Sequence, residues 1–168
     1  PALHVAMKHV VGVRKDIGVR SVFNILGPIT NPAGVRKQLI GVYDADLLHP
    51  LAEVLRQLNS EHVLLVHGDD GMDEISLAAD TKVVELRDSE IKEYKISPSD
   101  FGLEGSDEAI VGGDAAENAE IALRVLQGTR GAARDIVIAN AAAGLFAANI
   151  VDSLQAGAEA AKMAIDNG

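Results

Sequence analysis

Two adjacent carboxylates, Asp73 and Glu74, stand where the sequence is best suited to hold a metal ion. They follow an apolar run with the letters HVLLVH and a short glycine-containing loop, and ligands of open α/β sheets bind beyond the carboxyl ends of strands. With the hydroxyl of Ser76 they offer the hard oxygen ligands that suit Mg²⁺. A solvated acidic loop has the same pattern, because structural carboxylates are common. Asp69 and Asp70 are interpreted as solvated residues or turn formers.

The segment 13–33 carries further candidate binding groups. Arg14 falls in the last turn of an expected helix, where a cation complements the helix dipole. A planar guanidinium is equally suited to clamp a carboxylate, and composition does not choose between the two roles. Gly27-Pro28 and Asn31-Pro32 predict two breaks in the chain. They either fix a loop or form a rigid wall against a flat ligand, since glycine allows close approach of backbone.

The histidines predict no metal cluster. His4 and His9 are five residues apart, whereas two ligands on one helix face need a spacing of three or four. His4 is assigned a ligand contact, and the other histidines are assigned structural or surface roles.

Composition limits the classes of function. The 168 residues suit one domain, 48% of them are apolar and only 3% aromatic, and the net charge is −10. This charge disfavours broad nucleic-acid binding, and the lack of cysteine excludes a disulfide framework. No apolar run approaches the ~18 residues of a membrane span, and the N-terminus lacks the pattern of a signal peptide. We expect a soluble, cytoplasmic protein, and the start without Met inside a helical pattern indicates a fragment.

Hydrophobic periodicity predicts a single α/β domain over 1–168, with a mostly parallel mixed sheet and helices on both faces. The expected strands are 38–42, 62–67, 82–86 and 91–96, and the expected helices are 3–17, 21–26, 44–58, 114–126, 132–148 and 153–166. Gly112-Gly113-Asp114 is interpreted as a structural helix start, with Asp114 and Glu117 forming a capping box.

Three blocks of the sequence resemble anthranilate phosphoribosyltransferases. They are 4–32, the Asp73-Glu74 loop and the run from Arg124 through Ala143 (RVLQG to RDIVIANAAA). The resemblance implies the larger domain of a two-domain fold of the nucleoside phosphorylase and phosphoribosyltransferase type. It also implies Mg²⁺-dependent transfer of phosphoribose from phosphoribosyl pyrophosphate to anthranilate, in tryptophan biosynthesis, with no side chain acting as nucleophile or general acid or base.

The resemblance assigns a role to each matching residue. Asp73 and Glu74 would bind the Mg²⁺ that bridges to pyrophosphate, and Arg14 would meet the anthranilate carboxylate. The residues that would line the anthranilate tunnel are His4, Met7, Gly27 and Pro28. Met7 stands where some members carry an aromatic residue.

The family's pyrophosphate-cradling Gly-Thr-Gly-Gly-Asp loop, its Lys-His-Gly-Asn segment and its N-terminal helical domain do not occur in these 168 residues. We therefore expect the chain to be inactive alone, and the longer parent to be a homodimer through that N-terminal domain. The alternatives are a pyrimidine nucleoside phosphorylase-like enzyme, a non-catalytic nucleic-acid-binding relative on the same fold, or an α/β fragment without activity.

Overall fold

The computed structural model describes residues 12, 16, 26–27, 29–31, 33–106 and 112–168. The chain divides into two compact units, Pro1–Arg36 and Lys37–Gly168. The expectation of one domain over 1–168 stays a prediction, because most of the first unit lies outside the described residues. The expected helix 3–17 lies almost wholly outside them as well.

In the first unit, the expected break at Gly27 is wrong. Leu26, Gly27 and Ile29 are helical, and the Thr30 amide donates to the Leu26 carbonyl over 3.0 Å. The chain turns further on, where the Asn31 side chain accepts the Ala33 amide over 3.0 Å. Such a side-chain-to-backbone bond is the asparagine turn that the Asn31-Pro32 pair predicts.

The second unit is built on a four-stranded sheet in the order β1-β2-β3-β4. The strands are β1 (Lys37–Gly41), β2 (His62–Gly68), β3 (Thr81–Arg87) and β4 (Glu90–Ile96). β1 pairs with β2 in parallel, because the chain returns between them through the short helix η1 (Ala45–Leu47) and α4 (Leu48–Gln57). Strands joined in parallel need such a crossover.

The mixed α/β class is confirmed, but the described sheet is less parallel than expected. β2 pairs antiparallel with β3, and β3 pairs antiparallel with β4. The segment 69–80 between β2 and β3 contains no helix that could carry the chain back across the sheet. β3 and β4 are joined by Asp88 and Ser89, which both have positive φ angles, 51° and 67°, as a tight hairpin requires.

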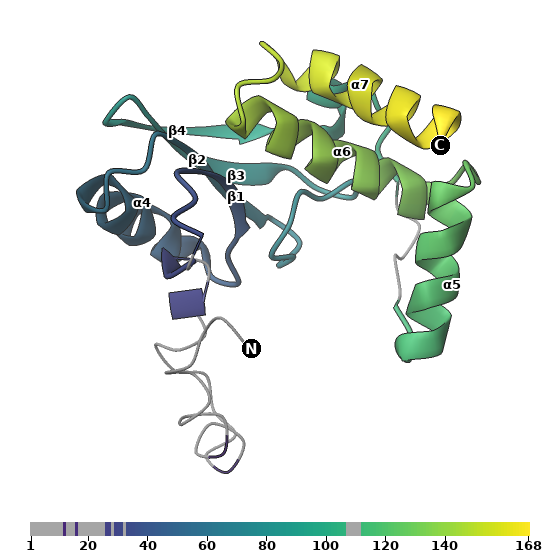
Figure 1. Ribbon diagram of the computed structural model, residues 1–168, viewed down its shortest axis with the longest axis horizontal. Coiled ribbons are helices and arrows are strands. Elements are labelled where there is room, and N and C mark those ends of the chain that lie inside the picture. Colours follow the sequence, from purple (N-terminus) through teal and green to yellow (C-terminus); the bar gives the residue numbers. More distant parts are fainter. Residues whose placement is uncertain (1–11, 13–15, 17–25, 28, 32, 107–111) are drawn as a thin grey trace. The chain divides into compact units, whose positions relative to one another are not determined.

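Helices cover both faces of this sheet (Figure 1). α4 packs on β2 and β3 through Leu48, Leu51 and Leu55. The other face carries α6 (Ala132–Ala147), and α7 (Leu154–Asn167) lies along α6. Gly157 allows the close contact of these two helices, since a β-carbon there would stand 2.7 Å from the Ala142 carbonyl oxygen.

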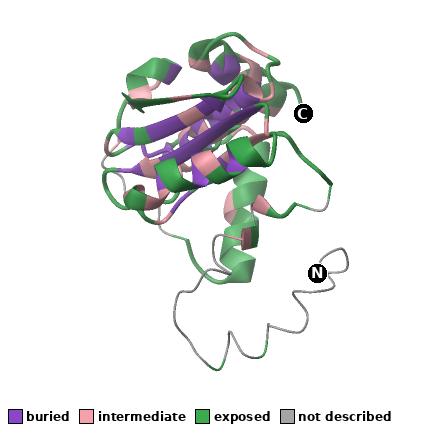
Figure 2. Ribbon diagram, turned by 90° about the vertical axis from the view of Figure 1, so that its left-hand side faces the viewer, coloured by how far each residue is buried: buried purple, intermediate pink, exposed green. Residues whose placement is uncertain are grey.

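The core lies between β2, β3 and α6, where the strands are buried over most of their length (Figure 2). α5 (Ala115–Leu126) begins at Asp114, whose side chain accepts the Ala116 and Glu117 amides in the expected capping box. The 3-10 helix η2 (Pro98–Phe101) follows β4 and buries Phe101. Within the described residues, none of the helices is long and apolar enough to cross a membrane.

Candidate functional site

The acidic loop 69–76 leaves the carboxyl end of β2 and folds back on itself. The Gly68 amide donates to the Met72 carbonyl over 2.8 Å, and the Gly71 amide donates to the Gly68 carbonyl over 2.8 Å. The Asp70 side chain accepts the Met72 amide over 3.2 Å, so Asp70 is a turn former. Gly71 has a φ of +93°, a conformation that glycine adopts without strain.

The loop rests directly on the end of β1. A β-carbon built on Gly41 would stand 1.6 Å from the carbonyl oxygen of Asp73. The absence of a side chain at Gly41 therefore lets Asp73 lie at the carboxyl end of the parallel pair β1 and β2. Ligands of open α/β sheets bind at this position.

Ser76 holds the loop together from inside. It is 1% exposed, its hydroxyl donates to the Asp70 carboxylate over 2.5 Å, and the same oxygen accepts the amides of Ala78 and Ala79 over 3.0 and 3.1 Å. These bonds occupy the hydroxyl, so the expectation that Ser76 offers an oxygen to a metal is wrong.

Asn140 reaches the loop from α6. Its side-chain oxygen accepts the Ile75 amide over 3.2 Å. Its Nδ2 donates to the carbonyl of Ile136, one helical turn earlier, over 3.0 Å, and lies 3.4 Å from the Ile75 carbonyl and 3.5 Å from Oε2 of Glu74. Asn140 and Gly41 were both missed as site residues at the level of sequence. The available signal for Asn140 was a lone carboxamide among apolar residues, in IVIANAAAG.

The carboxylates of the loop differ in their charge environment. The pKa of Glu74 is raised above its ordinary value by burial and then by the nearby charges of Asp73 and Asp70. The pKa of Asp69 is lowered, chiefly by a hydrogen bond from Lys95, whose Nζ lies 2.5 Å from Oδ2. Within the described part of the chain, neither Asp73 nor Glu74 forms an ion pair with a lysine or arginine.

These two carboxylates fit a divalent cation whose remaining coordination positions are filled by a ligand. Asp73 is exposed and Glu74 half-buried, and their negative charge has no described counter-ion. No group of three or more His, Asp or Glu residues able to hold a metal occurs in the described segments. Mg²⁺ needs no such cage, since it usually takes one or two carboxylates and fills its other positions with water and phosphate oxygens.

The other residues expected at the site belong to the first unit, and the structure describes only one of them. His4, Met7, Arg14 and Pro28 lie outside the described residues. Gly27 is exposed in the first unit, and a β-carbon there would meet no atom within 4 Å. Their placement in the ligand site stays a prediction.

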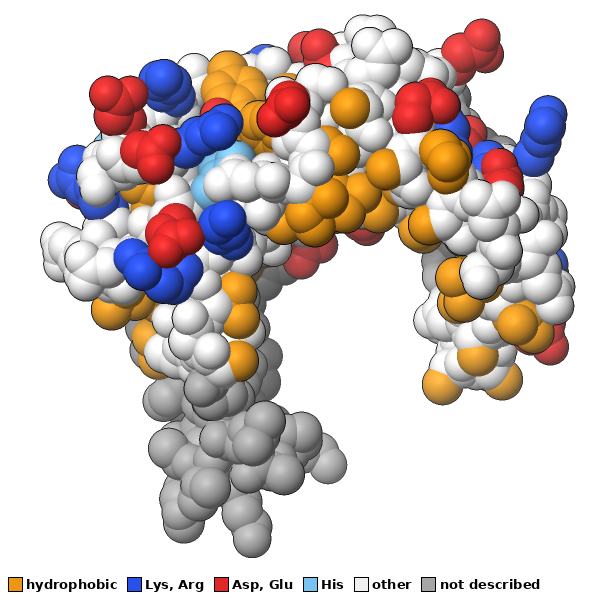
Figure 3. All heavy atoms as spheres, turned by 45° about the horizontal axis from the view of Figure 1, so that its top comes forward, with side chains coloured by type: hydrophobic (Ala, Val, Ile, Leu, Met, Phe, Trp, Pro, Cys, Tyr) orange, Lys and Arg blue, Asp and Glu red, His pale blue; other side chains and the backbone are white. Residues whose placement is uncertain are grey.

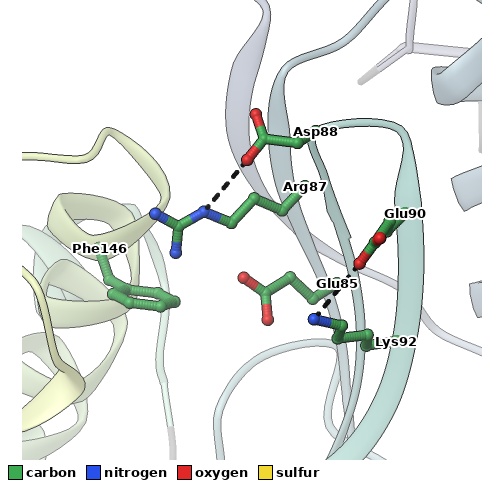
Figure 4. A pocket seen from close by; sticks show the side chains of 6 residues that line it. All are labelled: Glu85, Arg87, Asp88, Glu90, Lys92 and Phe146. Carbon is green, nitrogen blue, oxygen red and sulfur yellow. Dashed lines mark ion pairs between the residues drawn. The ribbon is translucent and has the colours of Figure 1, made fainter.

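A hollow of about 510 Å³ lies at the opposite end of β2 from the acidic loop, over the β3–β4 hairpin. Figure 4 shows Arg87, Glu85 and Lys92 on one side of it and Phe146 on the other. Arg87 pairs with Asp88 at 3.9 Å and lies over the Phe146 ring, 5.9 Å from its centroid. Lys92 pairs with Glu90 at 3.5 Å.

Four of the five charged side chains around this hollow therefore pair with one another. Figure 3 shows acidic and basic side chains intermixed on one face of the second unit. Behind the hollow, His62 is 1% exposed. Its Nε2 lies 2.9 Å from Oε1 of Glu85 and its Nδ1 lies 2.6 Å from Oδ1 of Asn149. The arrangement is a satisfied structural network, which agrees with the structural role assigned to His62.

Comparison with known proteins places the whole chain in one family. A family model described as the glycosyl transferase family, a/b domain, matches residues 1–168. An anthranilate phosphoribosyltransferase of Thermoanaerobacter sp. is 48% identical over 100% of the chain, which corresponds to 50% of that relative. One of Methanobrevibacter smithii is 50% identical over 98% of the chain and 50% of the relative.

Solved structures agree. Anthranilate phosphoribosyltransferase from Thermus thermophilus superposes with a TM-score of 0.85 at 41% identity, over 96% of this chain and 48% of that one. The Saccharomyces cerevisiae enzyme in complex with phosphoribosyl pyrophosphate and Mg superposes with a TM-score of 0.83 at 27% identity, over 98% and 47%. The chain thus spans about half the length of the relatives that it matches. The chain belongs to the glycosyl transferase family and corresponds to the α/β domain of that family.

Proposed function

We propose that this chain forms the α/β part of an anthranilate phosphoribosyltransferase, which transfers phosphoribose from phosphoribosyl pyrophosphate to anthranilate in tryptophan biosynthesis. The observation that carries the proposal is the 48–50% identity to relatives of that name along essentially the whole chain. The acidic loop at the carboxyl end of β1 and β2 supports it, because Asp73 and Glu74, which form no ion pair with a described lysine or arginine, suit a cation that accompanies a pyrophosphate.

The reaction is a displacement at carbon 1 of the ribose. The bond from carbon 1 to the pyrophosphate oxygen breaks, and the pyrophosphate leaves with the electron pair. The amine nitrogen of anthranilate forms the new bond to carbon 1, and the nitrogen then releases one proton to solvent. The substrates supply both nucleophile and leaving group, so no side chain has to attack.

In this scheme the chain binds and orients the substrates. Asp73 and Glu74 would hold Mg²⁺, which would neutralise the charge that develops on the leaving pyrophosphate. Arg14 receives the anthranilate carboxylate through its planar fork, with His4, Met7, Gly27 and Pro28 beside the aromatic ring. Fixing the acceptor in this way aims a weakly basic amine at carbon 1. We also propose that the longer parent protein is a cytoplasmic homodimer. This part of the proposal rests on the family resemblance alone.

The test uses the natural polypeptide that contains these 168 residues, with anthranilate, phosphoribosyl pyrophosphate and Mg²⁺. Loss of anthranilate fluorescence with release of pyrophosphate supports the proposal. Phosphorolysis of a pyrimidine nucleoside in place of that reaction, or nucleic-acid binding without turnover, contradicts it. The 168 residues alone are expected to be inactive.

Arg14→Ala tests the acceptor site, with Lys15→Ala as the matched control. Loss of a charged hydrogen-bond pair predicts a rise in the anthranilate Michaelis constant on the order of tenfold or more for Arg14→Ala. Lys15→Ala removes the neighbouring charge and is expected to leave that constant unchanged. If both substitutions raise the Michaelis constant equally, Arg14 contributes only its positive charge and makes no specific contact with the anthranilate carboxylate.

A further inference from the structure

Asn140 is a carboxamide placed on a buried, apolar helix. Its neighbours on α6 include Ile136, 6% exposed, and Ala139 and Ala143, which are not exposed at all. The bond from Nδ2 to the Ile136 carbonyl, 3.0 Å long, fixes the side chain against its own helix. A polar group in such surroundings needs partners, and within the described part of the chain the remaining hydrogen-bond partners of Asn140 belong to the acidic loop.

The bond to the loop acts on the peptide that follows Glu74. The amide that donates to Oδ1 of Asn140 over 3.2 Å is that of Ile75, so it belongs to the peptide unit joining Glu74 to Ile75. Because that unit is planar, holding its N–H restricts the backbone of Glu74 and with it the direction of the Glu74 side chain. Ile75 is itself 1% exposed, which anchors the far side of the same peptide.

The donor end of Asn140 faces the same residue pair. Nδ2 lies 3.4 Å from the Ile75 carbonyl and 3.5 Å from Oε2 of Glu74. Asn140 thus touches the backbone after Glu74 and stands beside its carboxylate. Gly41 supports the loop from β1, because the Asp73 carbonyl occupies the space of its absent side chain. Asp73 and Glu74 are therefore each held by a different element of the fold.

We propose that Asn140 is a positioning residue that sets the Glu74 carboxylate for a divalent cation. The inference rests on the proposed function for the identity of that cation as the Mg²⁺ that accompanies a pyrophosphate. Residues that orient a ligand carboxylate from behind affect metal binding although they never touch the metal. A purely structural asparagine would instead affect stability alone.

The chain offers a matched control for this distinction. Asn118 on α5 makes the same kind of clamp on another loop, since its Oδ1 accepts the Gly113 amide over 3.0 Å and its Nδ2 donates to the Gly113 carbonyl over 2.9 Å. No carboxylate of the acidic loop is among its hydrogen-bond partners in the described residues. Asn118→Ala therefore removes one accepted and one donated hydrogen bond of the same kind, at an exposed position away from Glu74.

The experiment titrates the natural polypeptide with Mn²⁺ alone and follows paramagnetic broadening of the Glu74 and Ile75 amide signals. Asn140→Ala and Asn140→Leu are compared with Asn118→Ala; the leucine keeps the branched shape of asparagine without its polar atoms and suits the apolar helix. We expect both Asn140 variants to weaken Mn²⁺ affinity about ten- to a hundredfold and to speed hydrogen exchange of the Ile75 amide. Asn118→Ala is expected to match the wild type in both measurements.

Wild-type Mn²⁺ affinity in a folded Asn140→Leu protein would overturn the inference, even where the wild type produces phosphoribosylanthranilate. The turnover assay decides the proposed function separately. A wild type without turnover, but with a Mn²⁺ response that Asn140→Leu weakens, would contradict the proposed function and uphold the role of Asn140.

Discussion

The carbonyl oxygen of Asp73 occupies the space that a side chain at Gly41 would need, 1.6 Å from the ideal position of its β-carbon. The two backbones therefore meet without intervening side chains. Gly41→Ala forces one of them to move, because a carbonyl oxygen of the main chain cannot rotate away as a side chain would. We expect a loss of about 1–3 kcal/mol in the free energy of unfolding together with a weaker Mn²⁺ response of the Glu74 amide.

Gly144→Ala is the control for that substitution. Gly144 lies in α6, and a β-carbon there would meet no atom within 4 Å. Replacing a helical glycine by alanine is expected to raise the free energy of unfolding by up to about 1 kcal/mol. Urea denaturation measures both variants, and a Gly41→Ala protein as stable as Gly144→Ala would refute the close contact.

His62 is expected to matter for stability and not for the acidic loop. His62→Phe removes the ring nitrogen that lies 2.9 Å from Glu85 and the one that lies 2.6 Å from Asn149. Losing these two hydrogen bonds of a buried ring is expected to cost about 1–3 kcal/mol, which urea denaturation can detect. Mn²⁺ affinity should stay at the wild-type value, because His62 and the loop lie at opposite ends of β2. A change in Mn²⁺ affinity without a loss of stability would contradict this division.

Lys95 is expected to control the ionisation of Asp69. The pKa of Asp69 lies below its ordinary 3.8 because Lys95 donates a hydrogen bond and adds its charge, with a further contribution from the charge of Lys82. Since the folded pKa is the lower one, the stability that this pair adds is present above about pH 4 and is lost as the pH falls through the folded pKa. Lys95→Met should raise the pKa of Asp69, and Lys82→Met should raise it less.

Carboxyl NMR titration measures these pKa values directly. Lys92→Met serves as the control, because Lys92 pairs with Glu90 on its own strand. An Asp69 that titrates at the same pH in Lys95→Met and Lys92→Met proteins would show that the Lys95 contact is absent in solution.

The elements of the second unit were largely predictable from the sequence. The apolar run HVLLVH forms β2, the leucine stripe of 44–58 forms η1 and α4, and Asp114 caps α5 as expected. These features depend on local patterns, since periodicity and capping act over a few residues. The direction of β3 relative to β2 depends on how the chain traverses 69–80. The sequence of that connection carries no local signal that distinguishes a crossover to a parallel strand from a direct return to an antiparallel one.

The acidic pair was predictable as a candidate, but the residues that hold it were not. Gly41 and Gly68 both end a described strand, and only the path of the loop above Gly41 gives that glycine its role. Ser76 resembles a ligand in the sequence, yet it turns inward to bond Asp70 and two amides. Asn140 lies 66 residues from Glu74, a distance at which residue type and spacing predict no contact.

The most direct test of the account is Mg²⁺-dependent formation of phosphoribosylanthranilate by the natural polypeptide in three forms. The forms are wild type, Asp73→Asn/Glu74→Gln, and Asp69→Asn as a control in the same loop, where the carboxylate is paired with Lys95. The account predicts turnover in the wild type and the control, and loss of the Mg²⁺-dependent rate in the double variant. A double variant that retains the wild-type dependence on Mg²⁺ would contradict the assignment of Asp73 and Glu74 as the cation site.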